Sequence, residues 1–207
     1  VFSASKAGGA SLMLSLLAMA FIYTSGAARI AAILAVVSLF GVSLVALPGS
    51  LRLVRALIHF ATYGDEAREI LYSITMQAIA MRPMTGWGLN SFSSIYLVMQ
   101  PDNFPRYYDK VHNTYLELAF DLGVPAAAAL VLAVVWLVVR CLRGFYERER
   151  DPELAGLGFL VAVLVGSHAF VDFSLQIPAM ACTFFAILGI AWTQSWSART
   201  SERTPDP

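Results

Sequence analysis

Long apolar stretches alternate with shorter polar breaks along the 207 residues of this chain. A run of about 17–21 apolar residues is long enough to cross a bilayer as a helix, and a helix satisfies its own backbone hydrogen bonds there. The pattern predicts five such spans, at Ala7–Tyr23, Ala27–Leu47, Pro125–Leu142, Leu154–Phe173 and Pro178–Trp196. We therefore expect an all-α, polytopic integral membrane protein.

A mixed segment, 48–113, separates the second span from the third. Within it, the sequence "GDEAREILYSITMQAIAMRPMTG" predicts one helix, because acidic residues favour a helix N-terminus and Pro83 and Gly86 favour its end. Apolar residues recur at helical spacing along this stretch, at Ile70, Ile74, Ala78 and Met81. The segment is thus expected to be helical at least in part.

A second, short helix is predicted directly after His112. Thr114 and Glu117 have the spacing of a capping box, in which two side chains cap the first backbone N–H groups of a helix. Gly123 suits the end of that helix, and Pro125 suits the first turn of the next span. His112 is therefore expected just ahead of a helix at a membrane edge.

The arginines of the short loops predict the orientation of the spans. Arg140, Arg143, Arg148 and Arg150 fall in the loop 140–153, and Arg199 and Arg203 fall in the tail 197–207. The turn Ser174–Gln176 has no basic residue. Because short basic loops stay inside the cell, the loop and the tail are expected to be cytoplasmic, and the segment 48–113 to be periplasmic in a bacterium.

Composition narrows the classes of partner and cofactor. With 14 basic and 14 acidic residues the net charge is zero, so no overall field favours nucleic acid. The two cysteines, Cys141 and Cys182, lack the spacing of a metal site, and we expect neither a metal nor another cofactor. The Gly-x-Gly of 86–88 lacks the strand and third glycine of a nucleotide site, and we expect it to allow a tight backbone path. Because the chain begins at Val1, it looks like the C-terminal part of a larger membrane domain.

Two stretches together carry a resemblance to a known family. "AREILYSITMQAIAMRPMTGWGLNSF", followed by "HNTYLELAFDLGVP", resembles the C-terminal half of the O-antigen ligase and polysaccharide polymerase superfamily, whose members transfer glycans from a polyprenyl diphosphate carrier. "SASKAGG" is similar to the family's Ser-Arg-Gly-Gly segment, and "SHAFVDFSLQIPAMACTFFAILGIAW" resembles its closing pair of spans.

The resemblance implies a GT-C-like, metal-independent, inverting glycosyltransferase in the bacterial inner membrane, with its active site facing the periplasm. Its donor would be an undecaprenyl-diphosphate-linked glycan. Its acceptor would be the lipid A core, a growing polysaccharide or a protein, and the sequence does not separate these three. The rival from another class is a non-catalytic transporter or binder of lipid-linked glycan, which would also need cations at the membrane edge but would not need His112.

His112 is the expected catalytic base or acceptor-orienting group, because the resemblance places the family's functional histidine here and an imidazole accepts a proton near neutrality. On position alone, His112 could instead be a structural histidine at a helix start. Asn113, in the substrate-contacting set, is expected to position that helix start or His112.

Cations are needed to stabilise the leaving diphosphate. The resemblance makes Arg68 the first candidate for that catalytic role, since a guanidinium pairs with phosphate oxygens in a fixed geometry. The alternative for Arg68 is a surface pair with Asp65. Lys6 stands where the family usually has arginine, and a lysine lacks the bidentate fork.

Other polar residues complete the candidate set. Arg82 and Lys110 are further candidates for substrate contacts, or are solvated or paired with Asp102 and Asp109. Trp87 would stack on a sugar or lie at the membrane interface. His168 and Asp172, four residues apart near the outer end of a span, are expected to support each other or the site.

Overall fold

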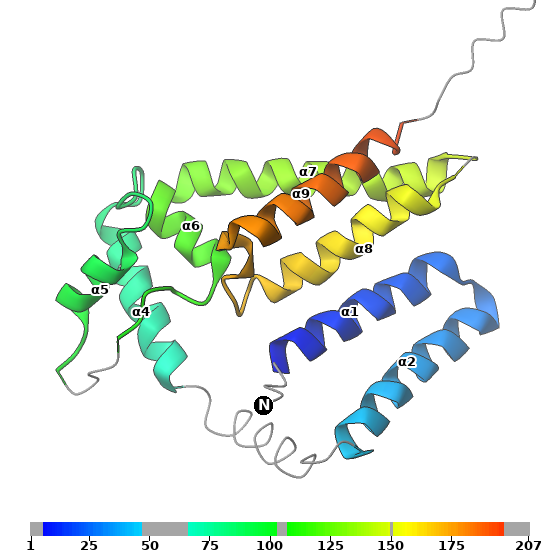
Figure 1. Cartoon of the computed structure of the whole chain (residues 1–207), viewed down its shortest axis with the longest axis horizontal. Coiled ribbons are helices and arrows are strands. Elements are labelled where there is room, and N and C mark those ends of the chain that lie inside the picture. Colours follow the sequence, from blue (N-terminus) through cyan, green and yellow to red (C-terminus); the bar gives the residue numbers. More distant parts are fainter. Residues whose placement is uncertain (1–5, 47–65, 103–106, 150, 197–207) are drawn as a thin grey trace, which may run out of the picture.

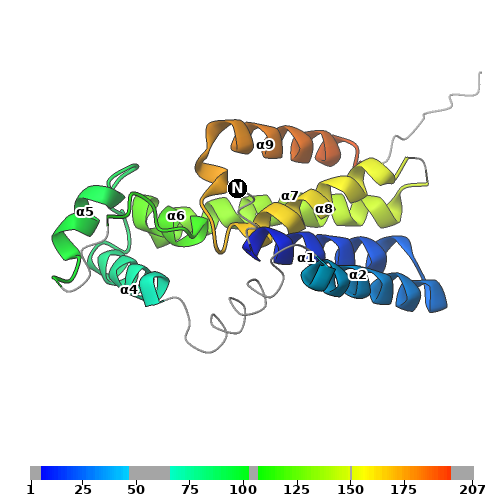
Figure 2. The ribbon, with the colours of Figure 1, turned by 60° about the horizontal axis from the view of Figure 1, so that its bottom comes forward.

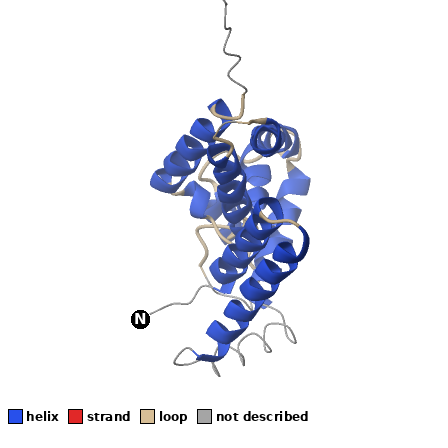
Figure 3. Ribbon diagram, turned by 90° about the vertical axis from the view of Figure 1, so that its right-hand side faces the viewer, coloured by secondary structure: helices blue, strands red, loops and turns tan. Residues whose placement is uncertain are grey.

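The computed structural model describes residues 6–46, 66–102, 107–149 and 151–196, and every regular element in these ranges is helical (Figures 1 and 3). The elements are α1 (Lys6–Tyr23), α2 (Gly26–Ala46), α4 (Glu66–Met81), α5 (Phe92–Met99), α6 (Thr114–Leu122), α7 (Val124–Glu147), α8 (Glu153–His168), the short 3₁₀ helix η1 (Ser174–Gln176) and α9 (Pro178–Thr193). The all-α prediction is confirmed for this part of the chain. Asp65 and the tail 197–207 lie outside the described residues.

The five predicted spans coincide with the apolar helices α1, α2, α7, α8 and α9. Helix α8 packs against α1, α7 and α9, and α2 packs on the far side of α1 (Figures 1 and 2). Small residues permit this close packing, because a side chain at Gly158 would collide with Ala191. Helix α8 ends at His168, five residues before the predicted end of that span, and α7 continues to Glu147.

Helix α7, with 24 residues, is long and apolar enough to cross a membrane by itself. Only 11% of its apolar window is buried inside the protein, so side chains such as Leu132 and Trp136 point outward. The other four apolar helices are shorter by the same measure. Membrane crossing by all five helices therefore stays a prediction.

Helices α4, α5 and α6 form a separate layer at one end of the bundle (Figure 1). Their shared core is apolar and aromatic, and it contains Leu71, Ile74, Ala78, Ile79, Phe92, Tyr96, Val111 and Phe120. Ile74 and Ala78, two of the apolar positions predicted for the helix that is now α4, are buried in this core, whereas Met81 is exposed. Helix α5 has no counterpart among the elements predicted from the sequence.

Two glycines allow the loop after α4 to pack closely against the junction of α6 and α7. Gly86 (φ 64°) and Gly123 (φ 80°) adopt positive φ angles, which cost a residue without a Cβ little. A Cβ at Gly86 would collide with the backbone of Asp121, and one at Gly123 with that of Met84. Val124 N donates to Pro83 O at 2.7 Å across this contact. The predictions of a tight path at Gly86 and a helix end at Gly123 are confirmed.

The polar connections separate to opposite ends of the bundle. The layer of α4–α6, the turn η1 and the first residue of α1 lie at one end, and the α7–α8 connection and the end of α9 lie at the other (Figure 1). At the latter end, Arg140 Nη2 donates to Ser195 O at 2.7 Å and so ties α7 to α9. Which end of the bundle faces which side of the membrane stays a prediction.

Candidate active site

His112 has a backbone that is fixed from several directions and an imidazole that is not. Its φ of 56° lies in the left-handed region, and its carbonyl oxygen accepts a hydrogen bond from Tyr72 Oη at 3.2 Å. The half-buried ring lies edge-on to Phe173, with 5.0 Å between centroids, and to Tyr108, with 6.2 Å. Neither ring nitrogen has a hydrogen-bond partner among the described residues, so the imidazole can bind an added group.

Asn113 caps the helix that follows. Its Oδ1 accepts hydrogen bonds from Tyr115 N at 3.0 Å and Leu116 N at 3.1 Å. The predicted Thr114–Glu117 capping box is wrong, because the helix begins at Thr114 and the preceding residue caps it. Thr114 instead binds the turn after α8. Its Oγ1 donates to Asp172 O at 3.0 Å, and its N–H donates to Ala169 O at 2.9 Å.

Glu117 holds the loop before His112 against α6. Its Oε1 pairs with Lys110 Nζ at 3.1 Å, and its Oε2 accepts Val111 N–H at 3.1 Å. Glu117 is 2% exposed and Val111 is fully buried. Lys110 therefore pairs with a helix residue rather than with either aspartate suggested by the sequence. The T-x-x-E spacing singled out Glu117 but gave it the wrong partner.

Helix α4 brings Arg68 to the same side of the layer as His112. Tyr72, which contacts His112, lies four residues after Arg68, and residues at this spacing share one face of a helix. The Arg68 side chain is half-buried. Tyr72 was not singled out from the sequence, because no local pattern shows which residue meets a loop 40 positions away.

Lys6 is the first residue of α1 and starts at this end of the bundle (Figure 1). Its side chain lies outside the described residues. Gly8 and Ser11, which follow on the same helix, line a pocket together with His168. The helix start therefore lies in the neighbourhood of the turn that binds Thr114.

Arg82 and Trp87 lie at the other end of α4. The Arg82 guanidinium sits 4.3 Å from the centroid of the Trp87 ring, and Trp87 Nε1 donates to Ala78 O at 2.8 Å. Fourteen residues separate Arg68 from Arg82, which corresponds to about 20 Å along a helix. The structure thus does not bring this pair together with His112.

His168 and Asp172 support each other, as predicted. The His168 Nε2 and Asp172 Oδ2 atoms are 2.9 Å apart, Ser174 Oγ donates to the same oxygen at 2.7 Å, and Phe173 N donates to Oδ1 at 2.8 Å. Burial by itself raises the pKa of Asp172, but these hydrogen bonds and the nearby imidazole outweigh it and hold the pKa below its usual value. The carboxylate is therefore ionised near neutrality.

Asp121 lies one turn after Glu117, and its pKa is shifted in the opposite direction to that of Asp172. Burial, together with the charge of Glu117, raises the pKa of Asp121 to about 6, against the smaller lowering effect of Lys110. Its Oδ1 is buried without a hydrogen-bond partner among the described residues. Across those residues, no three His, Cys, Asp or Glu side chains cluster closely enough to hold a metal ion.

Residues 1–131 match the protein-family model described as O-antigen ligase. The match covers more than half of the chain, from residue 1 through α1, α2 and the layer of α4–α6 into α7, and it includes every candidate residue from Lys6 to Asn113. No curated protein and no solved structure matches the chain.

Proposed function

The chain belongs to the O-antigen ligase family, and on that premise we propose that it transfers a glycan from an undecaprenyl-diphosphate carrier to an acceptor hydroxyl at the periplasmic face of the bacterial inner membrane. Family membership supports the coarse activity, an O-antigen ligase or polymerase type of glycosyl transfer on lipid-linked glycans. The acceptor, whether lipid A core, growing polysaccharide or protein, is the open part of the proposal.

The proposed reaction is an inverting displacement without a metal ion. The acceptor oxygen attacks the anomeric carbon, the bond from that carbon to the diphosphate oxygen breaks, and the hydroxyl proton passes to the His112 imidazole. Arg68, with Lys6 as a second cation, stabilises the charge that develops on the departing diphosphate. A guanidinium remains charged throughout and contributes without a proton transfer of its own.

The state of His112 is the observation that supports this assignment best. A non-glycine residue in the left-handed region costs about 1–2 kcal/mol, and the bond from Tyr72 together with the buried Val111 maintains it. A structural histidine at a helix start would use a ring nitrogen to bind the helix, but Asn113 performs that task here. The fixed backbone and the unengaged imidazole fit a group that is held ready for a substrate.

The remaining candidates take different parts in the proposal. Lys110 is 25% exposed beside Glu117, so its ammonium group can still donate to a substrate oxygen. Asn113 acts by fixing the helix start. Arg82 and Trp87 follow the C-terminal end of α4, about 20 Å along the helix from Arg68, so any contact with substrate is with a remote sugar of the glycan.

The test compares donor binding and product formation in purified full-length protein carrying His112→Ala. We expect product formation to fall by about 10²–10⁴-fold, the usual cost of losing a general base, with donor binding retained. Asn113→Ala is the matched control, because loss of a helix cap costs about 1 kcal/mol of stability without removing the base. Normal product formation by His112→Ala would remove the histidine from the mechanism. Movement of lipid-linked glycan without any transfer by the wild type would favour the non-catalytic transporter.

A further inference from the structure

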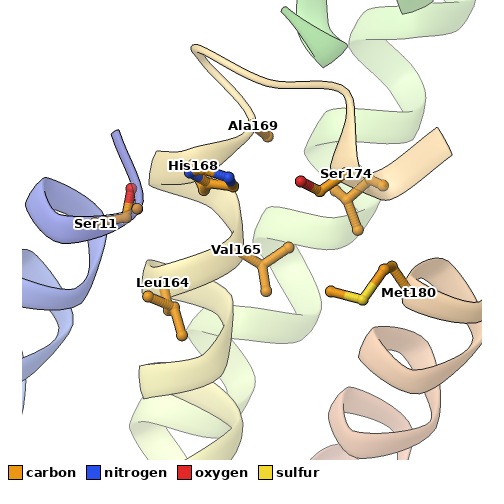
Figure 4. A pocket seen from close by; sticks show the side chains of 9 residues that line it. Ser11, Leu164, Val165, His168, Ala169, Ser174 and Met180 are labelled. Carbon is orange, nitrogen blue, oxygen red and sulfur yellow. The ribbon is translucent and has the colours of Figure 1, made fainter. Parts of the chain in front are cut away.

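The turn 169–173 connects α8 to η1, and Figure 4 shows where it leaves α8, at Ala169. Two hydrogen bonds from Thr114 hold this turn. The threonine N–H donates to Ala169 O at 2.9 Å, and its Oγ1 donates to Asp172 O at 3.0 Å. Thr114 and Ala169 are both buried, so water competes little for these bonds. The turn therefore has a fixed position relative to His112, which lies two residues before the threonine.

Phe173, the last residue of this turn, is held on both sides of its backbone. Its N–H donates to Asp172 Oδ1 at 2.8 Å, and its carbonyl oxygen accepts from Gln176 N at 2.8 Å. Its ring lies against that of His112, with 5.0 Å between the ring centroids and 70° between the ring planes. Aromatic rings favour this edge-to-face arrangement over a parallel sandwich. The turn thus places an aromatic ring against the imidazole from outside the loop that carries it.

No hydrogen bond orients the His112 imidazole, because neither ring nitrogen has a partner among the described residues. Contacts with neighbouring rings therefore limit its rotation. Tyr108 is the second ring in contact, but its centroid is 6.2 Å away, so Phe173 is the nearer support. The bond from Tyr72 fixes the backbone of His112 separately, so loss of the Phe173 ring should release the side chain alone.

We propose that Phe173 is a positioning residue for the glycosyl transfer, whose ring holds the His112 imidazole in the orientation that takes the acceptor proton. This inference rests on the proposed function and extends the site beyond residues 1–131, where the family match ends. A base must lie within hydrogen-bond distance of the proton that it takes. An imidazole that also populates other rotamers spends less time in the reactive one, and turnover falls in proportion.

The kinetic test measures kcat and the donor KM of Phe173 variants in purified full-length protein. An edge-to-face pair supports about a twofold to tenfold preference for one orientation, so kcat of Phe173→Ala should fall by that factor while the donor KM is unchanged. Phe173→Leu fills most of the space without a ring, which protects the fold, and its kcat should fall nearly as far. Phe173→Tyr keeps the ring and should retain most of the activity. Phe170→Ala is the matched control, because the ring that it removes from the same turn lies 4.5 Å from Tyr115 and not against His112.

The spectroscopic test observes the imidazole Cε1–H signals in protein whose histidines are labelled with ¹³C at that carbon. His112→Gln identifies the signal of His112 by its loss. The ring current of an aromatic side chain shifts the signals of protons close to it. We therefore expect the His112 signal to move in Phe173→Ala and Phe173→Leu, and to stay near its wild-type position in Phe173→Tyr and Phe170→Ala.

A His112 signal that stays in place in Phe173→Ala would overturn the proposal, and so would an unchanged kcat. An equal fall of kcat in Phe170→Ala would also overturn it, because the effect would then be general damage to the turn. The spectrum separates this inference from the proposed function. Normal product formation by His112→Ala would refute the proposed base, whereas a moved His112 signal in Phe173→Ala would still support the orienting contact.

Discussion

Replacing Glu117 tests how the loop that carries His112 is held. In Glu117→Ala the buried Val111 N–H loses its acceptor and Lys110 loses its partner. In Glu117→Gln a side-chain oxygen can still accept from Val111, and only the charge is lost. The two variants therefore separate the backbone hydrogen bond from the ion pair.

The structure sets the size of the expected effect. Leaving a buried donor such as Val111 N–H unsatisfied costs about 1–3 kcal/mol. The ion pair adds less, about 0–1 kcal/mol, because Lys110 is partly exposed and water screens the interaction. We expect Glu117→Ala to lose about 1–4 kcal/mol of stability, the sum of both contributions, and Glu117→Gln to lose about 0–1 kcal/mol, the ion pair alone.

The assay pairs thermal unfolding of the purified protein with product formation. Because the left-handed backbone of His112 costs about 1–2 kcal/mol, a released loop should leave it, and turnover should fall about tenfold in Glu117→Ala. Glu117→Gln should recover most of that loss. If Gln is as damaging as Ala to turnover while stability is normal, the carboxylate acts on substrate directly and the reasoning about the loop fails.

Four further predictions follow from the same geometry. Arg68→Ala should lower product formation by about 100-fold, because one charge-assisted bond to a developing anion is worth about 3 kcal/mol, and Arg68→Lys should recover part of that loss. Near-normal product formation by Arg68→Ala would show that the arginine is only a surface residue. Tyr72→Phe, which removes the hydrogen bond to the His112 carbonyl, should lower turnover severalfold with at most about 1 kcal/mol of lost stability, measured by kinetics and thermal unfolding. The pKa of Asp121 is raised from 3.8 to about 6 in the folded protein, so the folded state binds this proton more tightly than the unfolded state. The free energy of unfolding should therefore fall as the pH rises between these two values, and Asp121→Asn should abolish that fall when unfolding is measured across pH 4–7. Single cysteines at Ser93 and Glu147 should react with impermeant reagents from opposite sides of the membrane, and labelling from one side would overturn the orientation.

Much of the fold was accessible from local sequence signals. Apolar run length located five helices, and Gly123 and Pro125 marked the boundary between α6 and α7 correctly. These signals succeed because helix formation and helix ends depend on residues within a few positions of one another. The short helix α5 was missed because its stability comes from burying Phe92 and Tyr96 against α4 and α6 rather than from a pattern of its own.

The sequence by itself determined the all-helical architecture, the family, and the choice of His112 as the residue to test. Only the tertiary structure decided the contacts of those residues. Thr114 and Asp172 are 58 positions apart, yet their contact takes the threonine away from the predicted cap and gives that role to Asn113. The contact of Tyr72 with His112, 40 positions away, and the pocket beside His168 likewise follow from how the helices pack. Hydrogen bonds and close packing join whichever groups the fold brings within reach, and sequence spacing does not encode that proximity.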